Sequence, residues 1–341
     1  MEEKPTVSDF LQAAVRRFER LRESGETSFQ VRIAGQVIEQ RFCTAEHAAT
    51  VRQYMTGMIV PDTSTPDAVF YYWNESVNVY KPESANNVRA IWQSRDDTGY
   101  LRVTPGYAMI GVDHKNRAYL FCRHPSGAKE QLLFGHSMVV LFGWWARQNQ
   151  MMLLHSACVG VNGKGVMISA RGGGGKSTLS VSCLLGGFDF VADDYILVNR
   201  EGPLRAMPLY RTVGLNPDME SKLKPGLPVV RVYDERGGKM LLDASRFDFA
   251  KELPVHAILC PKIGGGDEPC IRPTDRGSVL AKIIDSTASQ LGVFRDPEQY
   301  RQMAQRLLTI PVYEISLCRD LDKNRECLRK FIEKELDTCT D

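Results

Sequence analysis

The spacing of hydrophobic residues changes period early in the chain. Between residues 8 and 23 apolar positions recur every three or four residues and Gly25 follows, which predicts an amphipathic helix. From residue 28 onward the period is two, which predicts strands. We expect hairpins around Ala34-Gly35 and around residues 74–76, and further strands over 100–104, 107–113 and 117–123. Residues 1 to about 127 therefore predict a mainly antiparallel α+β unit.

The second half of the chain has a different pattern of apolar residues, in which predicted helices and strands are mixed. An apolar helix is predicted over residues 129–148, followed by two strands within 151–170 that a tight turn at Asn162-Gly163 joins. Further elements are a helix from 176 to about 185, a strand over 188–192, helices near 276–288, 297–308 and 323–336, and a strand over 312–317. We expect two domains, residues 1–149 and 150–341, because 341 residues exceed what one core usually organises.

Composition excludes several classes of protein. Hydrophobic residues make up 43% and charged residues 25%, which is typical of a folded globular chain. With 43 Lys+Arg against 41 Asp+Glu the net charge is +2, so neither nucleic acid nor an anionic membrane is an expected partner. The nine cysteines are scattered without a CxxC pair, which indicates neither a zinc site nor a disulfide framework. No apolar stretch is long enough for a membrane helix, and we expect a cytoplasmic protein.

A glycine-rich run at residues 171–178, Arg-Gly-Gly-Gly-Gly-Lys-Ser-Thr, lies between a predicted strand and a predicted helix. It departs from the phosphate-binding P-loop pattern only at Ala170, where the pattern has glycine. Glycines let backbone N–H groups turn toward phosphate oxygens, and the helix N-terminus adds positive charge. The predicted ATP-binding residues are Gly172, Gly173, Gly174, Gly175, Lys176, Ser177 and Thr178, with Ser177 also on Mg²⁺. The alternative is a flexible loop that precedes Lys-Ser by chance.

Two adjacent carboxylates, Asp193 and Asp194, follow Lys176 closely in the chain. Such a pair suits phosphoryl transfer to a hydroxyl, since one can hold Mg²⁺ while the other takes the acceptor proton. His155 would tune the basicity of one of them, and Arg211 is the candidate cation for the transferred group. The alternatives are an ordinary acidic turn, a core histidine and a surface arginine. Residue types alone do not decide which aspartate is the base.

The run from His155 to Val198, with GGGGKST and VADDYILV, resembles the catalytic domain of HPr kinase/phosphorylase and its relatives, which share a core with ATP-dependent phosphoenolpyruvate carboxykinases. A weaker resemblance extends over residues 150–338. It implies an α/β fold, a mixed-sheet P-loop kinase domain of HPr kinase type preceded by an N-terminal α+β domain. The resemblance also implies that Asp193 is the catalytic aspartate, assisted by His155, and that Asp194 lies on the metal.

The sequence departs from the family's pattern at two places. The family's Arg-Pro-Gly-Arg-Asn segment has only a partial counterpart at Ile271–Arg276, so phosphorolysis and HPr itself as substrate are not implied; Arg171 is unusual within the loop. We expect a Mg²⁺- and ATP-dependent kinase acting on a hydroxyl, a Ser of a protein or peptide. The alternatives are a small-metabolite kinase and a nucleotide-binding regulatory module without turnover. The kinase relatives form hexamers, so a homo-oligomer is one further expectation.

Overall fold

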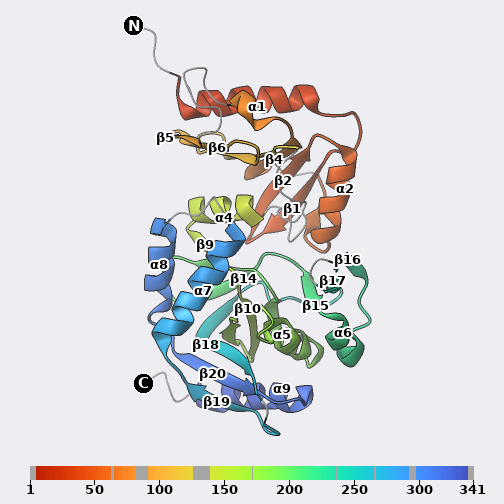
Figure 1. The fold of residues 1–341 in the computed structure, drawn as a ribbon, viewed down its shortest axis with the longest axis vertical. Coiled ribbons are helices and arrows are strands. Elements are labelled where there is room, and N and C mark those ends of the chain that lie inside the picture. The colour runs from red at the N-terminus through yellow and green to blue at the C-terminus, as the bar shows by residue number, and fades with distance from the viewer. Residues whose placement is uncertain are drawn as a thin grey trace. The chain divides into compact units, whose positions relative to one another are not determined.

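A computed structural model provides the structure of the chain, which divides into two compact units, Met1–Trp145 and Ala146–Asp341 (Figure 1). The division falls within helix α4 (Val139–Gln148). Both units are mixed α/β structures built on large sheets. The structure describes residues 5–62, 65–80, 91–125, 139–170, 172–234, 237–264, 266–291 and 297–336. Much of the apolar helix predicted over 129–148 lies outside these ranges; its last part is α4.

Unit 1 contains an eight-stranded sheet in the order β3-β1-β2-β4-β8-β7-β6-β5. Its strands are β1 (Ser28–Ile33), β2 (Gln36–Phe42), β3 (Ile59–Val60), β4 (Ala68–Asn74), β5 (Trp92–Asp96), β6 (Gly99–Thr104), β7 (Ala108–Asp113) and β8 (Ala118–Arg123). The pairs β2–β4 and β4–β8 are parallel and the other pairs are antiparallel. The predicted α+β unit is therefore present, with a mixed sheet.

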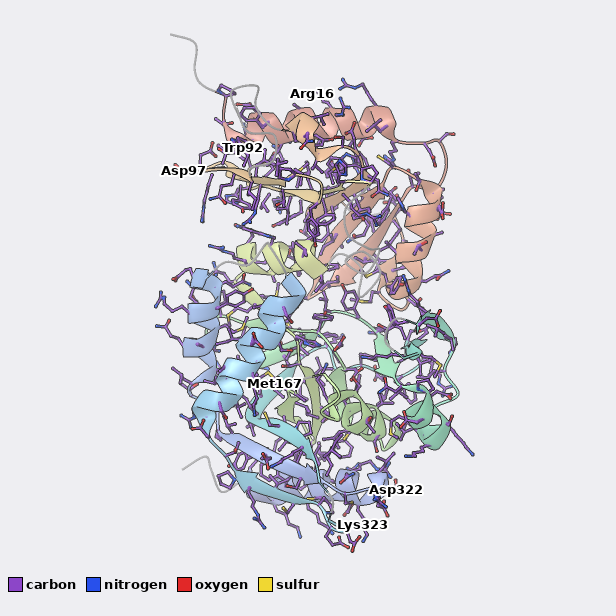
Figure 2. All side chains as sticks on the ribbon, viewed as in Figure 1. Arg16, Trp92, Asp97, Met167, Asp322 and Lys323 are labelled. Atoms are coloured by element: carbon purple, nitrogen blue, oxygen red, sulfur yellow. The ribbon has the colours of Figure 1, made fainter. Side chains whose placement is uncertain are left out.

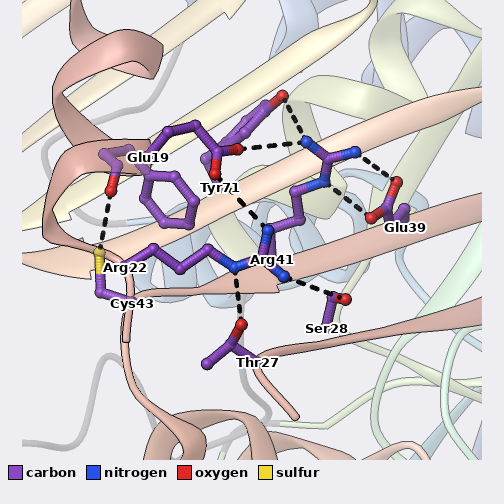
Figure 3. Close-up of polar contacts among 9 residues, drawn as sticks. Glu19, Arg22, Thr27, Ser28, Glu39, Arg41, Cys43 and Tyr71 are labelled. Atoms are coloured by element: carbon purple, nitrogen blue, oxygen red, sulfur yellow. Dashed lines mark hydrogen bonds and ion pairs between the residues drawn. The ribbon is translucent and has the colours of Figure 1, made fainter. Parts of the chain in front are cut away.

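Helix α1 (Val7–Leu21) covers one face of this sheet. It begins at Thr6, whose side chain forms a capping box with Asp9, and it buries Leu11 and Phe18 completely. Arg41 of β2 forms ion pairs with Glu39 and with Glu19 of α1 (Figure 3). Because these side chains are partly exposed, the ion pairs contribute little compared with the buried apolar face.

The hairpin predicted around residues 74–76 is wrong. After β4 the chain forms a 3-10 turn, η1 (Val77–Tyr80), and does not return as a strand. Both edges of β4 are already occupied, by β2 and β8. The Tyr80 hydroxyl accepts a hydrogen bond from Trp73 Nε1 at 3.0 Å and donates one to Glu75 at 2.6 Å, which folds the turn back onto the end of β4.

Unit 2 contains a nine-stranded mixed sheet. Seven of its strands have the order β12-β10-β11-β18-β14-β13-β9, while β20 pairs with β18 and β19 pairs with β20. Its strands are β9 (Met151–Leu154), β10 (Ala157–Val161), β11 (Lys164–Ile168), β12 (Asp189–Ala192), β13 (Ile196–Asn199), β14 (Arg205–Pro208), β18 (Leu253–Ile263), β19 (Cys270–Pro273) and β20 (Val312–Leu317). A separate sheet has the order β15-β17-β16, formed by Thr212–Leu215, Lys239–Asp243 and Val229–Tyr233 respectively.

Helices cover both faces of the large sheet in unit 2 (Figure 1). They are α5 (Lys176–Leu185), α7 (Arg276–Leu291), α8 (Pro297–Leu307) and α9 (Leu321–Lys330), while α6 (Pro217–Leu223) lies beside the small sheet. Val166 and Ile168 of β11 belong to the core that includes α5 and α9, whereas Met167, inside unit 2 in Figure 2, belongs to the core that includes α7 and α8. A strand buried on both faces requires the continuous apolar run that β11 has.

Two further sequence expectations concern composition. None of the cysteines within the described ranges forms a disulfide in the structure. In the same part of the chain, every helix is too short or too polar to span a lipid bilayer.

Gly111 tests the packing of α1 on the sheet. A Cβ at this position would collide with Leu11 Cδ2, because the helix approaches β7 at the glycine. We expect Gly111→Ala to lower the free energy of unfolding by about 2 kcal/mol in urea denaturation. Gly266→Ala is the matched control, since the nearest atom to its Cβ would be 3.7 Å away. Equal stability of the two variants would contradict this account of the packing.

Candidate functional site

His155 lies in a break between two strands, not within a strand as the sequence predicted. The chain changes partners at this point, because β9 pairs with β13 whereas β10 pairs with β11 and β12. The His155 N–H group has left the strand ladder and instead donates to Thr287 Oγ1 at 3.1 Å. Ser156, the second residue of the break, is fully buried.

Asp193 and Asp194 occupy a matching break between β12 and β13. Cys158 is paired with Ala192 on one side of the two breaks, and Leu154 is paired with Ile196 on the other. The two interruptions therefore lie side by side in the sheet. This register brings His155 next to the aspartate pair although almost forty residues separate them in sequence.

Asp194 is the meeting point of the predicted site residues. His155 Nε2 lies 2.8 Å from Asp194 Oδ1, and the Lys176 ammonium forms an ion pair with the same oxygen. Lys176 Nζ also donates to the backbone carbonyl of Asp193 at 3.0 Å. The three side chains are only 9–15% exposed, so their charges interact in a poorly solvated environment, where electrostatic contacts are stronger than in water.

Two residues of α7 hold the imidazole in place. Ser286 Oγ lies 2.5 Å from His155 Nδ1, while Thr287, the next residue, binds the His155 backbone. An ionised Asp194 can only accept hydrogen bonds, so Nε2 carries a proton and Ser286 donates to Nδ1 when the ring is neutral. Sequence reasoning missed both hydroxyl residues, because Ser286 is 131 positions away from His155 and belongs to no motif.

Asp193 has a different environment from Asp194. Its carboxylate is fully buried and accepts hydrogen bonds from Ser180 Oγ at 2.6 Å and from the Gly214 N–H at 2.9 Å. The resemblance implied that His155 assists Asp193, but the structure pairs His155 with Asp194. Asp193 instead joins the end of β12 to α5 and β15.

The glycine loop, residues 172–175, connects β11 with α5. Gly173 and Gly175 have φ values of +78° and +90°, a left-handed conformation that favours glycine. A Cβ at Gly175 would also lie 2.8 Å from Leu317 Cδ1. Among the residues that the structure describes, no side chain caps α5, and the first N–H groups of a helix have no partners within it. An uncapped helix N-terminus carries partial positive charge and can bind an anion through these N–H groups.

The remaining predicted site residues differ in position. Ser177 and Thr178 lie in the first turn of α5 and are partly exposed. The Arg211 guanidinium stacks on the Phe249 ring at 5.3 Å, and its described contacts include none of His155, Lys176 and Asp194.

Tyrosine rings line the site on one side. The Tyr195 ring lies 5.3 Å from the His155 ring, and the Tyr210 ring packs edge-on against Tyr195. Burial raises the pKa of Tyr210 well above its usual value, and the nearby Tyr233 and Asp194 raise that pKa further. Tyr210 therefore remains a neutral phenol next to the charged contacts.

No family model matches the chain. HPr kinase/phosphorylase from Chlorobium phaeobacteroides is 31% identical over 99 residues, which are 29% of this chain and 30% of that relative. Over this stretch the chain is distantly related to HPr kinase/phosphorylase. The match spans less than a third of the length of that curated HPr kinase/phosphorylase.

A solved structure, the Hpr(Ser) kinase/phosphatase from Coxiella burnetii, aligns with 54% of this chain and 98% of its own at 14% identity. Its TM-score of 0.30 is too low to support an argument about fold or function. The relationship to HPr kinase/phosphorylase therefore depends on the sequence match.

Two serines of α5 test the structural role of Asp193. Ser180→Ala removes a hydrogen bond to a buried carboxylate, and we expect about 2 kcal/mol lower stability. Ser182 is equally buried, but its hydroxyl has no hydrogen-bond partner among the described residues, so Ser182→Ala should be neutral or slightly stabilising. Both substitutions change helix propensity alike, so urea denaturation of the pair isolates the hydrogen bond. Indistinguishable variants would refute the anchoring role of Asp193.

Proposed function

We propose that unit 2 is an ATP- and Mg²⁺-dependent kinase, a P-loop kinase domain of HPr kinase type that transfers the γ-phosphoryl group to a hydroxyl. The observation that carries this proposal is the convergence of Lys176 and His155 on Asp194, beside the uncapped start of α5. The distant relationship to HPr kinase/phosphorylase supports the same reaction class.

The glycine loop and the first turn of α5 would bind the triphosphate. The backbone N–H groups of residues 172–178 would surround the phosphate oxygens, which explains why Gly173 and Gly175 have left-handed backbones. Lys176 would exchange its contact with Asp194 for the β- and γ-phosphates. This exchange would release the Asp194 carboxylate from its ion pair with Lys176 when the nucleotide binds.

The donor set near the loop fits a magnesium ion that arrives with the nucleotide. Within the described ranges, no three His, Cys, Asp or Glu side chains cluster to hold a metal by themselves. Mg²⁺ on a nucleotide needs only one or two protein ligands besides phosphate and water, and the Ser177 hydroxyl at the second position of α5 is such a ligand. The bound ion would neutralise phosphate charge during transfer.

Asp194 would take the proton of the acceptor hydroxyl. We assign this role to Asp194 because His155 contacts it, whereas both oxygens of Asp193 accept internal hydrogen bonds and its side chain is buried. His155, oriented by Ser286, would hold the Asp194 carboxylate in position and stabilise its charge. The proton would leave the hydroxyl oxygen for Asp194 while that oxygen forms a new bond to the γ-phosphorus. The bond from the γ-phosphorus to the β–γ bridging oxygen would break at the same time, and ADP would leave.

We propose a serine of a protein or peptide as the acceptor. The support is the name of the relative, a kinase of HPr, over the matched stretch. The residues of the proposed site would bind phosphate and accept a proton, so a small hydroxyl metabolite would undergo the same chemistry. The nature of the labelled product separates the two acceptors.

Nucleotide binding can be measured without the acceptor. We expect Lys176→Met to weaken binding of Mg·ATP at least about 100-fold in isothermal titration calorimetry, because a charged contact to two phosphates is lost. Lys222 is an exposed lysine of α6, and the control variant Lys222→Met should bind Mg·ATP as tightly as the wild type does. Wild-type protein that fails to bind Mg·ATP would refute the proposed function.

Phosphoryl transfer distinguishes the two aspartates. In a lysate of the source organism with γ-labelled ATP, Asp194→Asn should reduce labelling about 1,000-fold without reducing Mg·ATP affinity. Asp193→Asn should instead lower the midpoint of thermal unfolding, because its amide group cannot accept both hydrogen bonds.

Label in a protein band supports the serine acceptor, and label in the small-molecule fraction favours a metabolite. Full activity of Asp194→Asn would exclude Asp194 as the base. Tight binding of Mg·ATP with no labelled product would favour a regulatory module.

A further inference from the structure

Lys239 is a second lysine near Asp193, and no sequence motif marks it. It lies at the start of β17, whose neighbour β15 contains Gly214. A Cβ placed on Gly214 would lie 2.7 Å from Lys239 Cε and 3.0 Å from its ammonium. The same Cβ would lie 3.7 Å from Asp193 Oδ2. The end of the lysine side chain therefore crosses the glycine and borders the space beside Asp193.

Strand pairing explains this position. Gly214 is opposite Leu241 in the antiparallel pair, so Lys239, two residues before Leu241, has its side chain on the same face of the small sheet. The absence of a side chain at Gly214 leaves the space that the last carbons of Lys239 occupy. Gly214 also donates its N–H to Asp193. One glycine thus determines the positions of both the buried carboxylate and the lysine.

The ammonium of Lys239 is available for a ligand. Across the described ranges it forms no ion pair, although it lies near a buried carboxylate. Asp193 is satisfied by Ser180 and Gly214, so it does not require Lys239 as a hydrogen-bond donor. Lys176, by contrast, already contacts Asp194 and the Asp193 carbonyl.

We propose that Lys239 binds the γ-phosphate of ATP and stabilises the transferred phosphoryl group, the role expected of Arg211 from the sequence. This inference rests on the proposed kinase function and specifies how its site recognises the terminal phosphate. Lys176 and Lys239 approach the aspartate pair from different elements, α5 and β17. Lys239 would add to the positive charge that Lys176 and the magnesium ion place around the transferred group during the reaction.

Comparison of two nucleotides tests this contact without knowledge of the acceptor. By isothermal titration calorimetry, Lys239→Met should weaken Mg·ATP binding about 10- to 100-fold and Mg·ADP binding less than about threefold, since ADP has no γ-phosphate. Methionine retains the apolar stem over Gly214, and thermal unfolding of the variant shows whether the fold is kept. Lys222→Met is again the exposed lysine control.

A double-mutant cycle provides a second test of the contact between Lys239 and the γ-phosphate. Gly214→Ala places a methyl group 2.7 Å from Lys239 Cε, which forces the lysine side chain to move, and should cause the same selective loss of Mg·ATP affinity. When Gly214→Ala is combined with Lys239→Met, the affinity for Mg·ATP should fall little further, because both changes remove the same contact between Lys239 and the γ-phosphate.

Equal loss of ATP and ADP affinity, or no loss of either, in Lys239→Met would overturn the role of Lys239. If the wild type binds Mg·ATP, such a result leaves the kinase proposal intact. Failure of the wild type to bind either nucleotide would refute both proposals.

Discussion

A carboxylate that is completely removed from water is stable only if hydrogen-bond donors surround it, and Asp193 is such a group. Its donors come from Ser180 on α5 and from the backbone of Gly214 on β15. Three segments that are distant in sequence are therefore joined at one point. The position of Asp194, the next residue, follows from this junction, and so does the approach of Lys176 and His155.

The site can form because two neighbouring strands are interrupted at the same level of one sheet. The breaks at His155 and at Asp193-Asp194 release backbone groups from the ladder, and side chains of α7 and α5 take their place. A continuous strand would have directed these residues alternately into the two apolar cores.

The sequence predicted the elements around the site well, because local patterns define them. The helix after the glycine loop and the strands on both sides of it depend on neighbouring residues, and the structure has them at the expected places. Long-range contacts were not predictable. Ser286 reaches His155 from a distant helix, and Arg211 packs on Phe249 while Lys239 crosses Gly214. The hairpin expected after β4 failed for the same reason, since strands from elsewhere already occupy both edges of β4.

A crystal structure of the chain with Mg²⁺ and a non-hydrolysable ATP analogue tests the central claim most directly. The account predicts that the triphosphate lies against the N-terminus of α5, with the Lys176 ammonium on the β- and γ-phosphates and no longer on Asp194, and with His155 still paired with Asp194. An analogue bound elsewhere, with the Lys176–Asp194 ion pair unchanged, would contradict it.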